Sequence, residues 1–192
     1  MTTETKASPG RPREFDEGEA LTAMMNVFWR KGYEGTSLSD LVEATGLLRG
    51  SLYAAFGSKA EMYTHALNHY HAEIVVVGVN ALDADDDPEI ALRNFMCAPL
   101  DDRLRQGCFL CNASADRADS DPDTATRVRH SFARLEDALA GLVSRIKPDW
   151  NNAQVRGQAS LLLTNYTGLR IMSRSGVNQD TMHRAIETVL DI

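Results

Sequence analysis

The sequence predicts an all-α protein of about nine helices, and three observations lead to this prediction. Apolar residues recur three and four positions apart over segments of helix length, and no segment shows the alternation of a half-buried strand. Helix-start signals, in which Ser, Asp or Asn precedes such a segment, occur along the whole chain. The segment Ile74–Val79 has high β-propensity but continues a helical pattern with no turn before it, so it is predicted to end a buried helix.

The chain is expected to begin with a flexible basic arm over residues 1–13, which are rich in Thr, Ser, Pro and Gly. The basic residues of this arm are Lys6, Arg11 and Arg13. From Asp16 the pattern becomes helical, and Lys31-Gly32 supplies a cation and then a glycine, which commonly end a helix. One face of this first helix is formed by Leu21, Met24, Met25 and Phe28.

Two capping boxes and a glycine define the next three helices. An S-x-x-D box at residues 37–40 opens a short second helix, which Gly46 ends. A third short helix is expected over residues 49–56. An S-x-x-E box at residues 58–61 then opens a long helix that runs from Lys59 towards Leu82.

Asp-Pro-acid triplets at residues 87–89 and 121–123 combine an N-cap, a proline at the first helical position and a first-turn acid. The helix after the second triplet ends before Pro148. An asparagine at 151 or 152 is expected to cap a helix that reaches about Ser175, and Asn178 opens the last helix.

Composition and motifs limit the cellular compartment and the class of protein that the sequence predicts. The chain is 43% hydrophobic with a net charge of −7, and no apolar run approaches the ~18 residues of a membrane span. The first residues lack the apolar region of a signal peptide, so a cytoplasmic protein is expected. Three cysteines, an odd number, argue against a disulfide framework. No metalloprotease, P-loop, nucleophile-elbow or dinucleotide motif occurs, so an enzyme is not expected, and no cofactor is predicted.

Residues 35–63, GTSLSDLVEATGLLRGSLYAAFGSKAEMY, place two short helices on either side of a glycine turn, as in a helix-turn-helix. The marks within and beside it are GYEGTS at 32–37, the Gly46 turn, SLYxxF at 51–56 and Lys59. On these marks the chain resembles the TetR family of bacterial transcriptional regulators. The resemblance implies a helix-turn-helix DNA-binding domain over residues 14–60.

The same resemblance implies that residues 61–192 form a larger helical domain for regulation and dimerisation. It also implies a repressor that a small-molecule effector of unknown identity, or modification of a thiol, releases from its operator, with activation of the regulated genes as the alternative. Five large residues could line a ligand pocket there or belong to the plain core: Phe95, Met96, Phe109, Phe132 and Tyr166.

The third helix is expected to read double-stranded DNA. Arg49 is the one long polar donor at its start and can reach guanine O6 and N7. Leu48 and Gly50 offer apolar or close contact, and Ser51 can meet a base or a phosphate. The family pattern implies that the Tyr53 hydroxyl contacts a phosphate, with packing as the alternative.

Three further residues are expected at the DNA backbone. Thr36 and Ser37 stand at a helix N-terminus, where free N–H groups favour a phosphate, although Ser37 is also a cap candidate. Lys59 supplies a point charge at the start of the fourth helix. The arm could follow the adjacent groove.

A homodimer closed through residues 151–175 and 179–191 would read the two half-sites of a palindromic operator. Apolar residues of the first segment spread over more than one helix face, so one face can pack inside while another meets the partner. The residues concerned are Leu161, Leu162, Leu163, Tyr166, Leu169 and Met172. A fully buried helix in a monomer is the alternative.

Cys108 and Cys111, in QGCFLCNASAD, leave several interpretations open. A helix beginning at Gly107 would put Cys108 in its first turn, where the dipole favours a thiolate, with Arg103 and Arg105 just upstream. Cys111 would then be a resolving thiol, and Cys97 is a third candidate. Resemblance to electrophile-responsive family members favours a sensor thiol at Cys108.

Two other interpretations of the cysteines compete with this one. Buried cysteine packs as a small hydrophobe beside Phe109 and Leu110. A thiol redox or metal-handling helical protein that uses Cys108 and Cys111 is the alternative class of function. A metal site is not predicted, because zinc needs four ligands and too few are nearby. His65 and His69 have zinc-like spacing but are more simply a solvated helix face.

Overall fold

The computed structural model describes residues 15–84, 86–101 and 106–191, and within these ranges every regular element is helical. The basic arm expected over residues 1–13 lies outside them. The elements are α1 Glu17–Lys31, α2 Leu38–Thr45, α3 Arg49–Phe56, α4 Lys59–Tyr70, η1 His71–Val76, α5 Val77–Ala84, α6 Pro88–Cys97, η2 Ala98–Leu100, α7 Phe109–Asp116, α8 Pro122–Ile146, α9 Asn152–Arg174 and α10 Gln179–Leu190. Because α4, η1 and α5 follow one another without a loop as one long helix, the described ranges hold nine separate helices, which agrees with the prediction.

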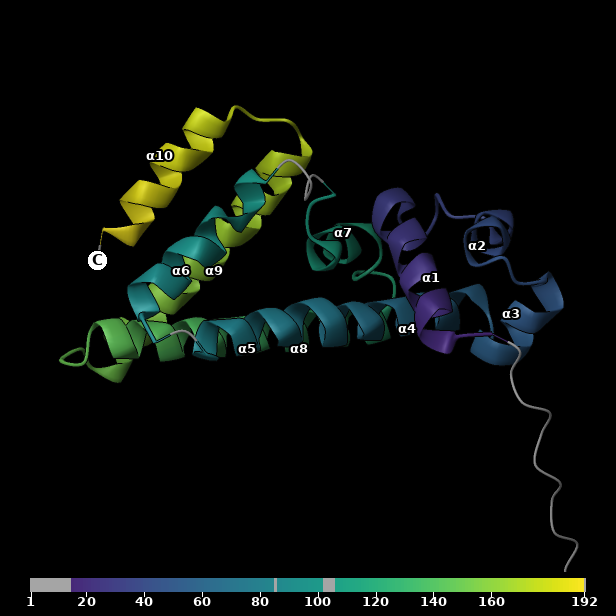
Figure 1. Cartoon of the computed structure of the whole chain (residues 1–192), viewed down its shortest axis with the longest axis horizontal. Coiled ribbons are helices and arrows are strands. Elements are labelled where there is room, and N and C mark those ends of the chain that lie inside the picture. Colours follow the sequence, from purple (N-terminus) through teal and green to yellow (C-terminus); the bar gives the residue numbers. More distant parts are fainter. Residues whose placement is uncertain (1–14, 85, 102–105, 192) are drawn as a thin grey trace, which may run out of the picture.

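Helices α1, α2 and α3 form a small head at one end of the molecule (Figure 1). The Ser37 side chain accepts from the Asp40 N–H and the Asp40 carboxylate accepts from the Ser37 N–H, so the predicted capping box is present. Gly46 ends α2 in the left-handed conformation, at φ 67°. The core of the head is formed by buried apolar side chains: Met24, Phe28, Leu41, Leu52 and Phe56.

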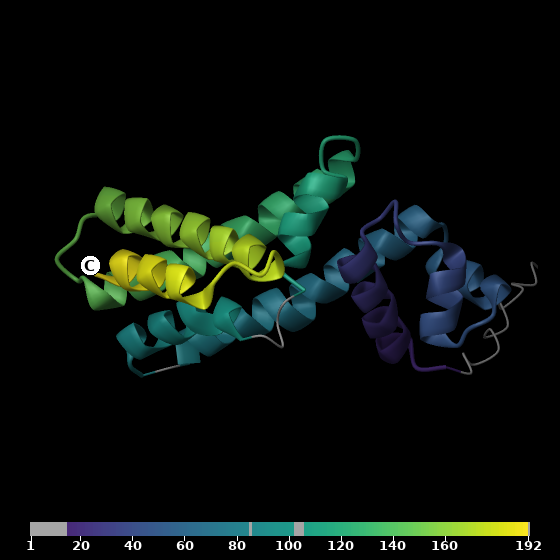
Figure 2. The ribbon, with the colours of Figure 1, turned by 90° about the horizontal axis from the view of Figure 1, so that it is seen from above.

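The long helix α4–η1–α5 connects this head to the rest of the molecule and lies along α8 (Figures 1 and 2). Ser58 and Glu61 form the predicted capping box at its start. The β-prone segment is helical, as expected, with Val75 and Val79 buried. A π-helical stretch, η1, interrupts the α-helix at His71–Val76, and nothing in the sequence pattern predicted it.

The second capping box offers a simple test of local stability. Ser58→Ala is expected to lower the free energy of unfolding by about 1 kcal/mol, because a donor at the start of α4 loses its acceptor. Urea denaturation followed by circular dichroism measures the change. Ser39→Ala, at an exposed position inside α2, is the matched control and should have almost no effect. Equal losses for both variants would contradict the role of the box.

The larger part of the molecule is built on α8, which packs along α9, with α6 and α10 beside them (Figure 2). Asn151 caps α9 and Asn178 caps α10 through their side chains, as the sequence predicted. Asp121 precedes α8 but makes no side-chain cap. Its carboxylate instead accepts from the Thr124 hydroxyl at 2.7 Å and pairs with Arg117 at 3.0 Å.

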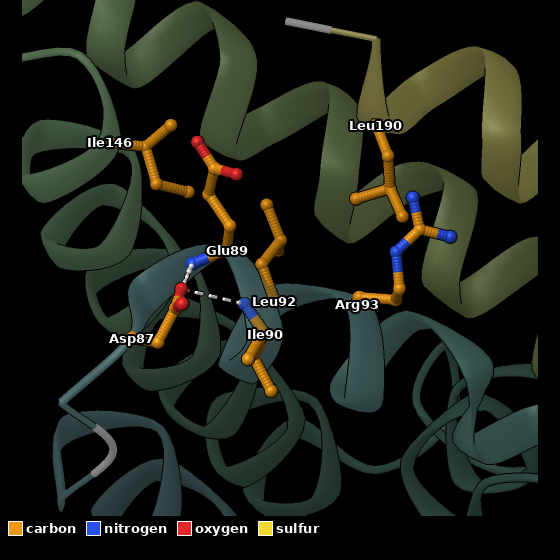
Figure 3. A pocket seen from close by; sticks show the side chains of 7 residues that line it. All are labelled: Asp87, Glu89, Ile90, Leu92, Arg93, Ile146 and Leu190. Carbon is orange, nitrogen blue, oxygen red and sulfur yellow. Dashed lines mark hydrogen bonds between the residues drawn. The ribbon is translucent and has the colours of Figure 1, made fainter.

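A hollow of about 240 Å³ lies between α6 and the ends of α8 and α10 (Figure 3). The Asp87 carboxylate on its rim accepts from the backbone N–H groups of Glu89 and Ile90, and so caps α6. Arg93 pairs with Glu187 at 2.6 Å. Asp87 therefore caps α6 and Arg93 connects α6 to α10, and Glu89 is the third charged residue of the lining.

Candidate nucleic-acid interface

The outward face of α3 combines an exposed cation with exposed apolar surface. Leu48, the N-cap residue, is 78% exposed, and Tyr53 is 44% exposed. The Arg49 guanidinium lies 5.8 Å from the centre of the Tyr53 ring. Leu52 and Phe56 occupy the opposite face of the helix and are buried. The tyrosine therefore does not pack in the core.

Gly50 and Ser51 complete this face, and both are exposed. A Cβ built on Gly50 would meet no heavy atom within 4 Å, so the packing of the protomer does not require glycine there. A small residue at this position leaves the backbone of the helix open to close approach by a ligand.

The polar groups at the N-terminus of α2 already have hydrogen-bond partners within the protein. Ser37 is exposed, but its hydroxyl and N–H both engage the Asp40 carboxylate. A hydrogen bond from Lys31, at 2.6 Å, and those from Ser37 lower the pKa of Asp40 to about 2. Thr36 is buried, and its hydroxyl donates to the Gly32 carbonyl at 2.6 Å, so this hydroxyl supports the turn from inside.

Lys59 begins α4, close to the end of α3, and its ammonium lies 4.4 Å from the centre of the Tyr33 ring. The Arg117 guanidinium lies 3.7 Å from the same ring. Tyr33 therefore joins the cation that begins α4 to the cation that follows α7.

Three side chains at the C-terminal part of α7 hold the head, and we call them the α7 clasp: Asn112, Asp116 and Arg117. Asn112 donates to the Trp29 carbonyl at 3.2 Å, and Asp116 accepts from the Tyr33 N–H at 2.5 Å. Arg117 supplies the contact with Tyr33 described above.

The α7 clasp requires a glycine at position 32, because a Cβ there would lie 2.9 Å from the Asp116 carboxylate. The φ of 72° at Gly32 also disfavours residues other than glycine. The same glycine ends α1. The end of α1 is therefore shaped to receive the carboxylate of α7.

The opposite end of α7 carries the cysteine pair. Cys108 is the N-cap residue and α7 begins at Phe109, so the helix starts later than the Gly107 start that the sequence suggested. Gly107 instead has φ 77° and forms the turn before the helix. Arg103 and Arg105, expected to assist the thiolate, lie outside the described residues.

Cys108 is buried among polar donors. The Tyr70 hydroxyl donates to the Cys108 Sγ at 3.6 Å. A hydrogen bond from the Cys111 thiol lowers the pKa of Cys108, and burial opposes this shift. The same bond, together with burial, raises the pKa of Cys111. Burial raises the pKa of Cys97, so Cys97 is a poor nucleophile.

Arg170 supplies the cation that Arg103 and Arg105 were expected to supply. It is buried in α9, donates to the Gly107 carbonyl, and its charge also favours the Cys108 thiolate. Its Nε has no hydrogen-bond partner among the described residues. Sequence reasoning missed Arg170, although a cation inside the apolar stretch LLLTNYTGLRIM is a signal of a specific buried role.

The other candidate ligand-pocket and metal residues have packing or hydrogen-bonding partners within the protein. Met96 and Phe109 are fully buried in the core, and Phe95 stacks on Tyr166 with ring centres 4.1 Å apart. Phe132 is partly buried against the core. His69 meets the Thr22 hydroxyl at 2.8 Å, rather than forming a solvated pair with His65. In the part of the chain that the structure describes, no three His, Cys, Asp or Glu residues are placed to hold a metal ion.

Comparison with known proteins identifies the class. Residues 20–66 match the family model described as bacterial regulatory proteins of the tetR family. The HTH-type transcriptional repressor ComR of Escherichia coli strain K12 is 29% identical over 96% of this chain and 92% of its own length. The uncharacterized HTH-type regulator YezE of Bacillus subtilis strain 168 is 25% identical over 95% of this chain and 98% of its length.

A solved structure extends the likeness to the whole fold. A cysteine mutant of the TetR family regulator CifR, in complex with 26-base-pair operator DNA, superposes with a TM-score of 0.76. It is 27% identical and covers 94% of this chain and 98% of its own. The fold and the exposed α3 thus define a helix-turn-helix transcriptional regulator, a class of DNA-binding proteins and not of enzymes. The chain belongs to the TetR family. Among the described residues, no helix is long and apolar enough to cross a membrane.

Proposed function

We propose that this chain is a dimeric repressor that binds a palindromic operator and leaves it when a small effector binds or when Cys108 is modified. The observation that carries the DNA-binding part is the outward face of α3, where Leu48, Arg49 and Tyr53 have no packing role in the head. A helix that buries one face and leaves a cation beside apolar surface on the other is suited to the major groove.

Each exposed residue has a distinct part in this proposal. Arg49 reads a guanine edge, and Leu48 meets a thymine methyl group. Gly50 permits close approach, while Ser51 and Tyr53 bond to the phosphates that border the groove. All five of these residues are exposed, as a contact with DNA requires.

Lys59 adds a phosphate contact at the start of α4, and Ser37 adds one when its hydroxyl turns from the Asp40 carboxylate to the phosphate. Thr36 acts from inside the head, because its hydroxyl is already bonded to Gly32. The DNA-binding domain is taken as residues 14–60 and the regulatory domain as 61–192, with the long helix that starts at Lys59 joining them.

A homodimer through residues 151–175 and 179–191 is supported by the outer face of α9. Leu161 is 52% exposed and Ile171 is 55% exposed, so α9 carries two large apolar side chains that the protomer does not cover. Gly157 and Gly168 lie on the same helix face and allow another helix to approach closely. Leu162 and Leu169 are buried within the protomer and cannot contribute to an interface.

The release step is proposed at the cysteine pair. When hydrogen peroxide is the oxidant, the Cys108 thiolate attacks one oxygen, the O–O bond breaks, and hydroxide leaves with Cys108 as a sulfenic acid. The Cys111 thiol then displaces that hydroxyl as water and a disulfide forms. Alkylation of Cys108 by an electrophile would place a larger group in the same buried position.

The α7 clasp supports a route from this site to the DNA-binding head. Cys108 caps α7, and the clasp residues Asn112 and Asp116 lie one and two turns further along the same short helix. A change in the position of Cys108 therefore moves a rigid element whose other end holds Trp29 and Tyr33. The distance between the two heads of a dimer would change with it.

The DNA-binding part is tested with two variants and the DNA upstream of the protein's own gene. Arg49→Ala is expected to reduce the preference for the operator over random DNA by about tenfold, because a bidentate base contact is lost. Lys59→Ala should weaken binding to all sequences alike and reduce the salt slope of log K by about one. Gel-shift titrations at several salt concentrations measure both effects.

Lys147→Ala, at the C-cap of α8 and outside both the α3 face and the proposed dimer interface, is the control for the loss of one positive charge and should bind as the wild type does. An Arg49→Ala protein with unchanged operator preference would contradict the assignment of Arg49 as a base reader.

A further inference from the structure

A second hollow, separate from the cysteine pair, lies where the long helix crosses α7 and α8. Its volume is about 330 Å³. The side chains around it come from all three elements: Leu67, Asn68, His71, Leu110, Thr126, Arg127, His130 and Ser131. An occupant would touch the helix that carries Lys59 and the helix that carries the clasp.

The charged groups around this hollow are all basic. Arg127 and two histidines line it, and no carboxylate is among its described lining residues. Arg127 donates to the Asn68 amide oxygen at 2.6 Å, while its buried Nε has no hydrogen-bond partner among the described residues. A buried guanidinium N–H without an acceptor costs free energy until an acceptor arrives. In a chain of net charge −7, this basic concentration is a local exception.

The two histidines are in contact. The ring centres of His71 and His130 lie 5.2 Å apart, and His71 Nδ1 is 2.9 Å from the Ser131 hydroxyl oxygen. Burial first, and then the charges of His130 and Arg134, lower the pKa of His71. A negative charge beside these rings would oppose this shift. His71 also begins the π-helical stretch, a deviation often found at functional sites.

We infer that this hollow binds a small organic anion, with its negative group between Arg127 and the His71–His130 pair and its apolar part against Leu67 and Leu110. The two leucines and the volume favour an anion with a hydrocarbon part over a bare inorganic ion. A metal ion fits less well, because the described lining residues offer two imidazoles and no carboxylate or thiolate. The effect of this binding on the operator complex rests on the proposed function, whereas the existence of the binding site does not.

The site is tested without DNA, by titrating the full-length protein with sodium benzoate in a calorimeter. Benzamide, of the same shape but uncharged, and inorganic phosphate are the comparison ligands. We expect saturable benzoate binding, with benzamide and phosphate each weaker by about tenfold or more. Histidine ring proton signals in the NMR spectrum should shift with benzoate, and only for His71 and His130.

Arg127→Gln and His130→Gln are each expected to weaken benzoate binding by about tenfold, and Lys147→Gln, at the C-cap of α8, is the charge-matched control that should not. His130 is exposed, so this second variant keeps the test valid if loss of Arg127 disturbs folding. Equal binding of benzamide, or full affinity in His130→Gln, would overturn the site. Equal binding of phosphate would overturn the assignment to an organic anion.

A gel shift with and without benzoate then tests the link to DNA. We expect benzoate to weaken operator binding by the wild type and to have no effect on His130→Gln. Benzoate binding without any effect on an intact operator complex would overturn only the regulatory role of the site. A protein that binds benzoate but no operator would contradict the proposed function and leave the site in place.

Discussion

Leu161→Glu is expected to convert the proposed dimer into monomers and to weaken operator binding by about 100-fold or more, because each half-site would have to be bound separately. In a two-fold interface a residue near the axis faces its own copy, so one substitution introduces two like charges into an apolar contact. Leu161 is suited to this test because it is 52% exposed, so the protomer itself should fold normally.

Ile90→Glu is the matched control, since Ile90 is 53% exposed but belongs to α6, outside the proposed interface. Sedimentation equilibrium at micromolar concentration measures the association, and a gel shift measures operator affinity. A wild type that sediments as a monomer yet binds a palindrome tightly would refute the proposed dimer. So would a Leu161→Glu protein that remains dimeric.

Oxidation of the wild type with hydrogen peroxide is expected to lower operator affinity by at least about tenfold, whereas Cys108→Ser should keep its affinity under the same treatment. Because the pKa of Cys108 is lowered, its thiolate persists at pH values below the ordinary range of a thiol. The rate of inactivation should therefore fall less between pH 8 and pH 7 than the rate for an unperturbed thiol. Well below its pKa, an unperturbed thiol loses thiolate, and with it reaction rate, by roughly tenfold per pH unit.

Reduction with dithiothreitol should restore the affinity, since a Cys108–Cys111 disulfide is reversible. Cys97→Ser is the matched control and should respond like the wild type. If mass spectrometry shows complete modification of Cys108 while operator affinity is unchanged, the pair belongs to the core and has no part in release.

The α7 clasp separates transmission of the signal from its detection. Asp116→Ala is expected to keep operator binding within about threefold in the reduced protein and to lose most of the response to peroxide, because the Tyr33 N–H loses its acceptor. Asp116→Asn retains an acceptor oxygen and should restore the response. A full response in Asp116→Ala would show that the signal reaches the head by another route.

Much of the head could be predicted from the sequence, because the interactions that define it are local. The Ser37–Asp40 and Ser58–Glu61 boxes each join residues three apart, and a helix turn brings such residues together whatever the surroundings. The inward Leu52 and Phe56 and the outward Arg49 and Tyr53 follow from helix periodicity in the same way.

Tertiary structure was needed for the cysteine pair and for the second hollow. Cys108 meets Tyr70 from 38 positions away, and Arg170 reaches Gly107 over 63 positions. The contact of His71 with Ser131 spans 60 positions. No periodicity links such residues, because only the crossing of whole helices decides which side chains meet.

The faces of α9 show, within one helix, what the sequence determines and what only the tertiary structure decides. Its apolar residues determined by themselves that α9 is helical and buried on at least one side. They did not determine that Leu162 turns into the protomer while its neighbour Leu161 remains exposed. Successive residues lie about 100° apart around a helix, so only the packing of α8, α10 and η2 against α9 decides which of two adjacent leucines is covered.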